Sequence, residues 1–196
     1  ARKSSFGSLA AADFDQDGDL DLFVAGRVEP TRYPIAVDSY FFENDRGTLR
    51  LAHTFSKLGM VTGVVFSDLD GDGSPELIVA REWNTLKVFS GELGQPKDIT
   101  QQWQLDQLSG WWNGITSGDF NGDGRMDLVA TNWGHNHKYE LSTTHPLKLY
   151  YGDLDQNGIL DLVESYQHAS SGQERPIRSL RTVGLAIPMI RQRMRT

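Results

Sequence analysis

Short apolar segments recur along the chain, and polar turns separate each from the next. Four of them, SLAAADF, GVVFSDL, GITSGDF and KLYYGDL, lead into an acidic loop, and LDLFVAG, PELIVAR, MDLVATN and LDLVESY follow these loops in the same order. Apolar runs of this length between turn residues are typical of β-strands. The pattern therefore predicts an all-β protein built on four strand–loop–strand hairpins.

Further strands follow the first two hairpins and flank the last loop. Residues 39–51 contain two apolar runs around an Asn-Asp-Arg-Gly turn, and residues 86–91 with the stretch up to Trp103 form a less regular pair. Around the last loop we expect strands at 147–151 and 159–166. Each complete group then has about four strands.

The acidic loops share one pattern of oxygen-bearing residues. Positions 1, 3, 5 and 9 hold carboxylates or amides, and position 6 is glycine. Positions 1, 3, 5, 7 and 9 are Asp13, Asp15, Asp17, Asp19 and Asp21 in the first loop, Asp68, Asp70, Asp72, Ser74 and Glu76 in the second, Asp119, Asn121, Asp123, Arg125 and Asp127 in the third, and Asp153, Asp155, Asn157, Ile159 and Asp161 in the fourth.

This spacing is typical of a calcium loop. Side-chain oxygens at positions 1, 3, 5 and 9 and the backbone carbonyl at position 7 can surround one hard cation, while the glycine permits the sharp turn. Calcium takes six to eight oxygen ligands in flexible geometry. The sequence therefore predicts up to four Ca²⁺ ions.

Charge supports a metal in these loops. They hold four, four, three and three carboxylates at the ligand positions, which is 14 of the 26 acidic residues. At an effective dielectric constant near 20, two carboxylates in close contact repel by about 4 kcal/mol. Four Ca²⁺ ions would change the formal net charge from -7 to +1. The alternative is four solvated acidic turns, because Asp and Gly are common in turns.

The flanking segments separate these loops from helix-flanked EF-hands. An EF-hand needs a bidentate Glu at position 12 and a helix on each side. Position 12 here is Val24, Val79, Ala130 or Glu164, and the flanks are predicted strands. We expect Glu164 to be a strand residue, not a ligand.

The spacing of the loops predicts the architecture. They begin at positions 13, 68, 119 and 153, and repeats of about 40–50 residues built of short strands are typical of β-propeller blades. We expect three four-stranded blades at about 6–56, 61–104 and 110–168, the last one holding two calcium loops. These blades form a propeller segment over residues 1–172.

The segment 173–196 differs from the rest of the chain in charge and in the spacing of its apolar residues. Residues 174–196 contain six Arg and one acidic residue, and their apolar residues recur at helical spacing. The segment therefore predicts a short basic amphipathic helix that is interrupted at Pro188. It can bind a membrane or an acidic partner, or it can pack on its own propeller, which we favour.

The motifs resemble a known repeat family. Residues 6–22, FGSLAAADFDQDGDLDL, are similar to the FG-GAP repeat of integrin alpha chains and to the VCBS repeats of bacterial surface proteins. Ala25-Gly26-Arg27 replaces the closing Gly-Ala-Pro, which makes the repeat more similar to VCBS. The motifs GDFNGDG, NWGHN, PLKLYY and PIRS at 118–124, 132–136, 146–151 and 176–179 resemble the ASPIC/UnbV group that includes cartilage acidic protein.

The resemblance covers most of residues 6–180. It implies a calcium-bound β-propeller, usually of seven blades, that serves adhesion or recognition. Three blades cannot close a ring, and open sheet edges favour association. The chain also begins without Met. We therefore expect a fragment of a larger propeller or, as the alternative, a homodimer that completes the ring.

Composition narrows the setting and the partners. No apolar run approaches 18 residues, so no transmembrane segment is expected, and the net charge of -7 argues against nucleic acid as a partner. The chain has no Cys, which excludes disulfides and thiolate metal sites. Calcium loops of this kind would be filled at about millimolar calcium. The expected location is secreted, periplasmic or at the cell surface.

The sequence gives only weak signals for a catalytic site. His135 and His137 can place two imidazoles on one metal, but a solvated loop is favoured because no third ligand is in view. Residues 142–145 (STTH) lack a nucleophile turn. No enzymatic activity is therefore expected.

Four tryptophans near predicted strand ends leave the binding function open. Aromatic side chains there can stack on sugars, although packing within or between blades is favoured; they are Trp83, Trp111, Trp112 and Trp133. We expect a calcium-binding module for extracellular or cell-surface protein interaction or adhesion. The alternatives are a carbohydrate-recognition propeller, which can form part of a polysaccharide-degrading enzyme, and a purely structural segment. The partner is thus a protein ligand or a glycan.

Overall fold

The chain divides into two compact units, Ala1–Asn136 and His137–Thr196, which we describe separately. The structure is a computed structural model that describes residues 4–92, 94–134, 145–168 and 170–193, with the backbone alone for 191–193. Among these residues, strands dominate and helices are short, so the all-β prediction is confirmed.

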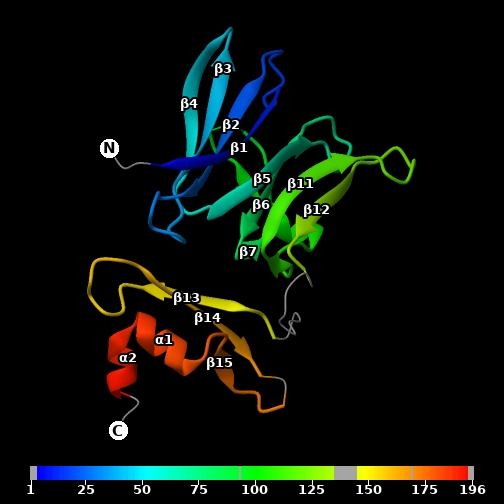
Figure 1. Cartoon of the computed structure of the whole chain (residues 1–196). Helices are drawn as coiled ribbons and strands as arrows, with labels where there is room; N and C mark the ends of the chain where they lie inside the picture. The colour runs from blue at the N-terminus through cyan, green and yellow to red at the C-terminus, as the bar shows by residue number, and fades with distance from the viewer. Residues whose placement is uncertain (1–3, 93, 135–144, 169, 194–196) are drawn as a thin grey trace. The chain divides into compact units, whose positions relative to one another are not determined.

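The first unit begins with a four-stranded antiparallel sheet in sequence order (Figure 1). Its strands are β1 (Ser5–Ala12), β2 (Asp21–Val28), β3 (Ser39–Asp45) and β4 (Thr48–Phe55). Arg46 and Gly47 connect β3 to β4 with φ angles of 51° and 85°. Two residues at positive φ match the twist of a two-residue hairpin, so the predicted Asn-Asp-Arg-Gly turn lies where expected.

The second sheet has the order β5-β6-β8-β9, and its fourth strand is short. The strands are β5 (Met60–Ser67), β6 (Glu76–Glu82), β8 (Lys87–Ser90) and β9 (Lys97–Asp98), followed by a 3₁₀ helix at Thr100–Trp103. Two smaller strand pairs complete the described part of the first unit. The short strands β7 (Asn84–Thr85) and β10 (Ser109–Gly110) pair with each other, and β11 (Trp112–Gly118) pairs with β12 (Asp127–Asn132).

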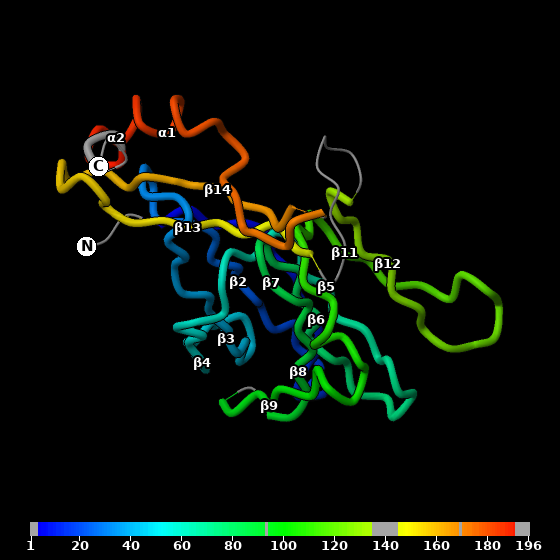
Figure 2. Tube along the Cα trace, turned by 90° about the horizontal axis from the view of Figure 1, so that it is seen from below, coloured from blue at the N-terminus to red at the C-terminus, as the bar shows by residue number. Residues whose placement is uncertain are grey.

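The second sheet lies between the first sheet and the β11–β12 pair (Figure 2). All seven residues of β6 are buried, and successive side chains point to opposite faces. Leu77 and Val79 pack in a core with the first sheet, whereas Ile78 packs in a second core with partly buried residues of β11 and β12. Sheets stacked face to face around a shared core are the arrangement of propeller blades.

The first strands of the three sheets approach each other closely. Ser8 Oγ of β1 donates to Thr62 O of β5 at 2.9 Å, and Thr62 Oγ1 donates to Trp112 O of β11 at 2.7 Å. A Cβ atom on Gly63 would lie 2.8 Å from Gly114 Cα. Glycine is therefore required where β5 meets β11.

The second unit has a three-stranded antiparallel sheet in the order β13-β14-β15, followed by two helices. Its elements are β13 (Lys148–Gly152), β14 (Asp161–Gln167), β15 (Glu174–Pro176), α1 (Leu180–Ala186) and α2 (Pro188–Arg193). The predicted short C-terminal helix is confirmed, and Pro188 begins its second part. Strand β15 was not predicted, because its three residues, Glu174 to Pro176, pair only with β14 and carry no apolar period.

Side chains of α1 and of the sheet line an apolar cavity of about 330 Å³ within the second unit. Tyr150 and Val163 contribute from the sheet, and Val183, which is buried, contributes from α1. The Ser179 side chain caps α1 by accepting the Thr182 N–H at 3.2 Å. This part of the basic tail thus packs within its own unit.

The predicted blade boundaries stay predictions. The first two sheets span residues 5–55 and 60–98. For the predicted third blade, β11–β12 and β13–β14 belong to different units, and the segment 135–144 between them lies outside the described residues. Across the residues that the structure describes, no helix is long and apolar enough to span a membrane.

We predict that Gly63→Ala lowers the free energy of unfolding by about 1–3 kcal/mol, because the backbone of β11 must move to admit the methyl group. The added Cβ would meet Gly114 Cα at 2.8 Å and Ile115 N at 2.9 Å. Gly94→Ala is the matched control, since nothing lies within 4 Å of its Cβ. Urea unfolding measures both variants, and equal stability would contradict the close approach of the strands.

Candidate metal sites

The four acidic loops share one backbone conformation. The residue at position 4 and the glycine at position 6 have positive φ in every loop. The φ angles at position 4 are 63° for Gln16, 80° for Gly71, 78° for Gly122 and 62° for Gln156, and those at position 6 are 96° for Gly18, 90° for Gly73, 82° for Gly124 and 85° for Gly158. Each loop joins two antiparallel strands, as the sequence predicted.

The carboxylate at position 1 closes each loop. It accepts the N–H of the position 6 glycine at 2.9–3.1 Å; these carboxylates are Asp13, Asp68, Asp119 and Asp153. In the last three loops its other oxygen accepts the N–H of position 5. In the first loop this oxygen, Asp13 Oδ1, is buried and has no hydrogen-bond partner. A buried oxygen without a partner leaves room for a cation as its ligand.

The side chains at positions 3 and 5 fold back on the loop. Each accepts the N–H two residues further on, at 2.7–3.3 Å, through one oxygen. The acceptors at position 3 are Asp15, Asp70, Asn121 and Asp155, and those at position 5 are Asp17, Asp72, Asp123 and Asn157. These bonds fix the side chains beside the position 1 carboxylate.

The position 9 carboxylate joins each loop to its second strand. It accepts the N–H of position 2 at 2.9–3.1 Å; the acceptors are Asp21, Glu76, Asp127 and Asp161. Asp21 is fully buried and also accepts the Asn44 N–H at 3.0 Å. Burial raises the pKa of Asp21 and of Glu76, because a buried carboxylate loses hydration of its charge.

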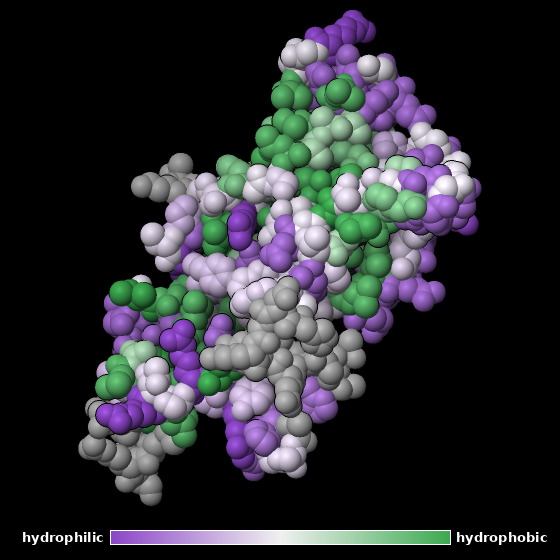
Figure 3. Space-filling view, turned by 45° about the vertical axis from the view of Figure 1, so that its right-hand side comes forward, coloured by the Kyte–Doolittle hydropathy of each residue, from purple (hydrophilic) through white to green (hydrophobic). Residues whose placement is uncertain are grey.

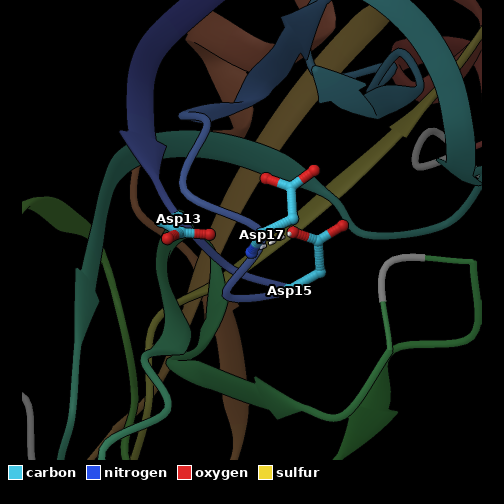
Figure 4. A group of neighbouring side chains, drawn as sticks. All are labelled: Asp13, Asp15 and Asp17. Carbon is cyan, nitrogen blue, oxygen red and sulfur yellow. Dashed lines mark hydrogen bonds between the residues drawn. The ribbon is translucent and has the colours of Figure 1, made fainter. Parts of the chain in front are cut away.

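Three loops bring three carboxylates together. Their ligand oxygens lie within 4.8 Å of one another in the groups Asp13–Asp15–Asp17 (Figure 4), Asp68–Asp70–Glu76 and Asp153–Asp155–Asp161. Partial desolvation raises the pKa of the exposed Asp15, and the charges of Asp21 and Asp17 raise it further. Such a cluster of oxygens is able to hold a hard cation.

The third loop is the exception among the described residues. It has the same hydrogen bonds, but Asn121 stands at position 3 and no group of three carboxylates gathers there. Hydrogen bonds from backbone N–H groups, first that of Gly124, lower the pKa of Asp119. A cation in this loop would need the Asn121 amide oxygen as a ligand.

Residues at position 7 would contribute their backbone carbonyls to an ion, as in other calcium loops. The Asp19 carboxylate is engaged outside the loop, since its Oδ2 accepts the Arg46 N–H at 2.7 Å. Ser74, Arg125 and Ile159 have no carboxylate, and each bonds through its N–H to the position 5 side chain. The sequence alone does not indicate whether the carboxylate or the backbone carbonyl of Asp19 is available as a ligand.

Several supporting residues were not identified from the sequence. Asn44, near the end of β3, and Arg46, in the turn after it, bind the first loop. The Asn44 side chain donates to Leu20 O at 3.0 Å, and the Arg46 N–H donates to Asp19. Gln16 donates to the second loop. No spacing rule links these residues, because the contacts form only after the sheets are paired and stacked.

A second cluster lies at the strand ends opposite the acidic loops. Trp83 follows β6, Trp111 precedes β11 and Trp133 follows β12. Their ring centroids are 5.0 Å apart for the first pair and 4.6 Å for the second. Trp83 Nε1 donates to Tyr33 OH at 2.6 Å. We call these four residues the aromatic row; Trp112, the fourth predicted tryptophan, instead donates to Leu108 O.

A buried carboxylate anchors the aromatic row. Tyr33 OH donates to Glu82 Oε2 at 3.0 Å, and Glu82 Oε1 pairs with Arg27. Burial, together with the Glu82 charge, raises the pKa of Tyr33 to about 12, so its hydroxyl keeps its proton at neutral pH. Trp133 is 39% exposed at the end of the row. His135 and His137 follow it in sequence and lie outside the described residues.

Comparison with known proteins agrees with the loop geometry. The family model for the FG-GAP-like repeat matches residues 13–79 and 68–130, which together cover more than half of the chain. Each match begins at the first aspartate of an acidic loop. The T-cell immunomodulatory protein of Mus musculus is 32% identical over 87 residues, which are 44% of this chain and 14% of the relative. The chain thus spans a small part of that protein's length.

We predict that Asp21→Ala destabilises the protein even in chelator, because the buried N–H of Phe14 and the half-buried N–H of Asn44 lose their acceptor. Each unsatisfied group costs about 1–3 kcal/mol. Asp127→Ala is the matched control at the same loop position, where Phe120 is 60% exposed and water can replace the carboxylate. Chemical unfolding measures both, and equal losses would show that burial of Asp21 does not set its role.

Proposed function

The chain belongs to the FG-GAP-like repeat family, and we propose that it is a calcium-binding propeller segment for protein interaction or adhesion outside the cell or at its surface. The observation that carries this proposal is the common geometry of the four loops. In each loop, one pattern of hydrogen bonds holds the oxygen-bearing side chains in the order of a calcium loop.

Calcium suits the donors better than other common metals. All proposed ligands are carboxylate, amide or carbonyl oxygens, which are the ligands of hard cations, while zinc sites use mainly Cys and His. The buried Asp13 Oδ1 without a partner fits a cation in the first loop. The side chains at positions 1, 3, 5 and 9 and the carbonyl at position 7 would hold the ion in each loop.

The proposed role of calcium is to stabilise the turns of the four hairpins. The carboxylates satisfy the N–H groups of the loop but repel one another, and a divalent cation removes that repulsion. The ion is therefore assigned to stability and shape, and no bond-making step is assigned to it. The binding reading is favoured over catalysis because FG-GAP-like repeats cover most of the first unit.

Exposed apolar residues support an incomplete ring. Phe6 and Leu9 of β1 and Leu51 of β4 are 49%, 63% and 55% exposed, and Val129 of β12 is 47% exposed. These residues lie on the two outer sheets of the first unit, and Figure 3 shows hydrophobic surface over this unit in green. Further blades, from the rest of a longer protein or from a second copy, would bury such surfaces.

Recognition of a glycan is the second candidate function, and the aromatic row favours it. Two half-buried indoles and the exposed ring of Trp133 offer a stacking surface, and the guanidinium of Arg27, which pairs with Glu82, offers a polar group elsewhere on the row. The same rings also join successive sheets, so packing explains part of the row. A protein partner would use this face or the surrounding loops without stacking on sugars.

We predict that calcium raises the melting temperature and that Asp70→Ala removes part of this rise. Losing one ion should remove about 2.7 kcal/mol of calcium-dependent stabilisation at a calcium concentration 100 times the dissociation constant. In chelator the variant should stay within about 1 kcal/mol of the wild type, because Asp70 is exposed there. Thermal melts in calcium and in chelator test this prediction. Asp106→Ala, outside the loops, is the control, and no calcium effect in the wild type would overturn the proposal.

The glycan candidate predicts that Trp133→Ala abolishes glycan capture while calcium-dependent melting is unchanged. A glycan array probed with the calcium-loaded chain tests it, and Trp112→Ala serves as the control because Trp112 lies outside the aromatic row. Absence of any glycan signal from the wild type would leave the protein-interaction proposal standing and remove the second candidate.

A further inference from the structure

The Gln16 side chain connects the first acidic loop to the second. Its Nε2 donates to Ser74 Oγ at 2.8 Å and to Gly73 O at 3.2 Å. Gln16 is position 4 of the first loop, whereas Gly73 and Ser74 are positions 6 and 7 of the second. The two proposed ions would therefore lie in loops that touch through one amide.

The acceptors of Gln16 lie in the part of the second loop that closes on the ion. The Gly73 N–H bonds Asp68 Oδ2 at 2.9 Å, and the Ser74 N–H bonds Asp72 Oδ1 at 2.7 Å. The Ser74 carbonyl is the proposed position 7 ligand. Gln16 thus binds the segment between two ligand side chains and one ligand carbonyl.

Gln16 adopts a backbone conformation that ordinarily favours glycine. Its φ is 63°, and the second and third loops have Gly71 and Gly122 at this position. A residue with a Cβ pays about 1–2 kcal/mol there. The two hydrogen bonds to the second loop offset this cost only when that loop is folded. The conformation of one loop is therefore linked to the conformation of the other.

We propose that Gln16 couples the two loops, so that calcium in one raises the affinity of the other. This inference rests on the proposed calcium function. An ion that orders one loop also orders the other loop through the Gln16 amide. Binding of the second ion then costs less conformational entropy. Repulsion between the two ions lowers the affinity for the second ion. This repulsion does not depend on the neutral Gln16 side chain, so a Gln16 variant isolates the coupling.

The coupling is specific to this pair of loops. Gly71 and Gly122 have no side chain to reach a neighbouring loop. Gln156 occupies position 4 of the fourth loop with a φ of 62°, yet its side chain donates to no other loop among the described residues. Gln156 is therefore a natural control for Gln16.

The test is a calcium titration of the chain followed by NMR at the amides of the position 6 glycines. Gly18 reports the first loop and Gly73 the second. In the wild type we expect both to shift together with a Hill coefficient above one. Gln16→Gly, which keeps the left-handed backbone, should lower the calcium affinity of both loops by about fivefold and bring the Hill coefficient to one or below. Gln156→Gly should leave both curves unchanged.

Two further variants test reciprocity. Asp15→Ala removes a proposed ligand of the first loop, and Asp70→Ala removes one of the second. Each should weaken calcium binding at the other loop by the same factor, and neither should do so in the Gln16→Gly background. Ser74→Ala, which removes one acceptor and keeps the ligand carbonyl, should reproduce part of the Gln16→Gly effect.

The failures are distinguishable. Glycine shifts that follow calcium in both loops, with the same curves in the wild type and in Gln16→Gly, would overturn the coupling and leave the calcium function intact. No calcium-dependent shift at any of the four glycines would overturn both.

Discussion

The hairpins of this protein depend on carboxylates that bond the backbone of their own loops. Every turn between the first two strands of a repeat would otherwise leave several N–H groups without partners. The acidic side chains accept these N–H groups, from the position 6 glycine to the start of the loop, and so hold two antiparallel strands in register. The same solution gathers like charges within a few ångströms. Local hydrogen bonding thus generates an electrostatic cost that a divalent cation is suited to remove.

Packing between sheets follows from this arrangement. The buried strand β6 begins directly at the second loop, with Glu76 as its first residue, and presents Leu77 and Ile78 to opposite neighbours. Because alternate residues face different sheets, a shift of β6 by one residue would exchange both cores. The loop that fixes the start of β6 therefore also fixes the contacts of three sheets. The close approach at Gly63 adds a second constraint, since it sets the distance between the first strands.

Much of the fold and of the candidate site follows from the sequence. The alternation of short apolar runs and the spacing of oxygen-bearing residues predicted the hairpins, and the position 6 glycines predicted the turns at positive φ. The contacts that join one repeat to another could not be predicted. Gln16 and Ser74 lie 58 positions apart, and Tyr33 and Glu82 lie 49 apart, without any periodic signal. Strand β15, which pairs with β14 at residues 174–176, was also not predicted, because these residues carry no apolar period.

Strands β2 and β6 connect the acidic loops at one end of the sheets to the aromatic row at the other end. Strand β6 runs from Glu76 in the second acidic loop to Glu82, which anchors the aromatic row through Tyr33. Strand β2 runs in the same way from Asp21 to Arg27, and Arg27 pairs with Glu82. An ion in the loops therefore needs no contact with a partner at the opposite end. By holding the first residues of two neighbouring strands, it would hold their last residues as well, and the recognition surface would lose its shape when the loops lose the ion.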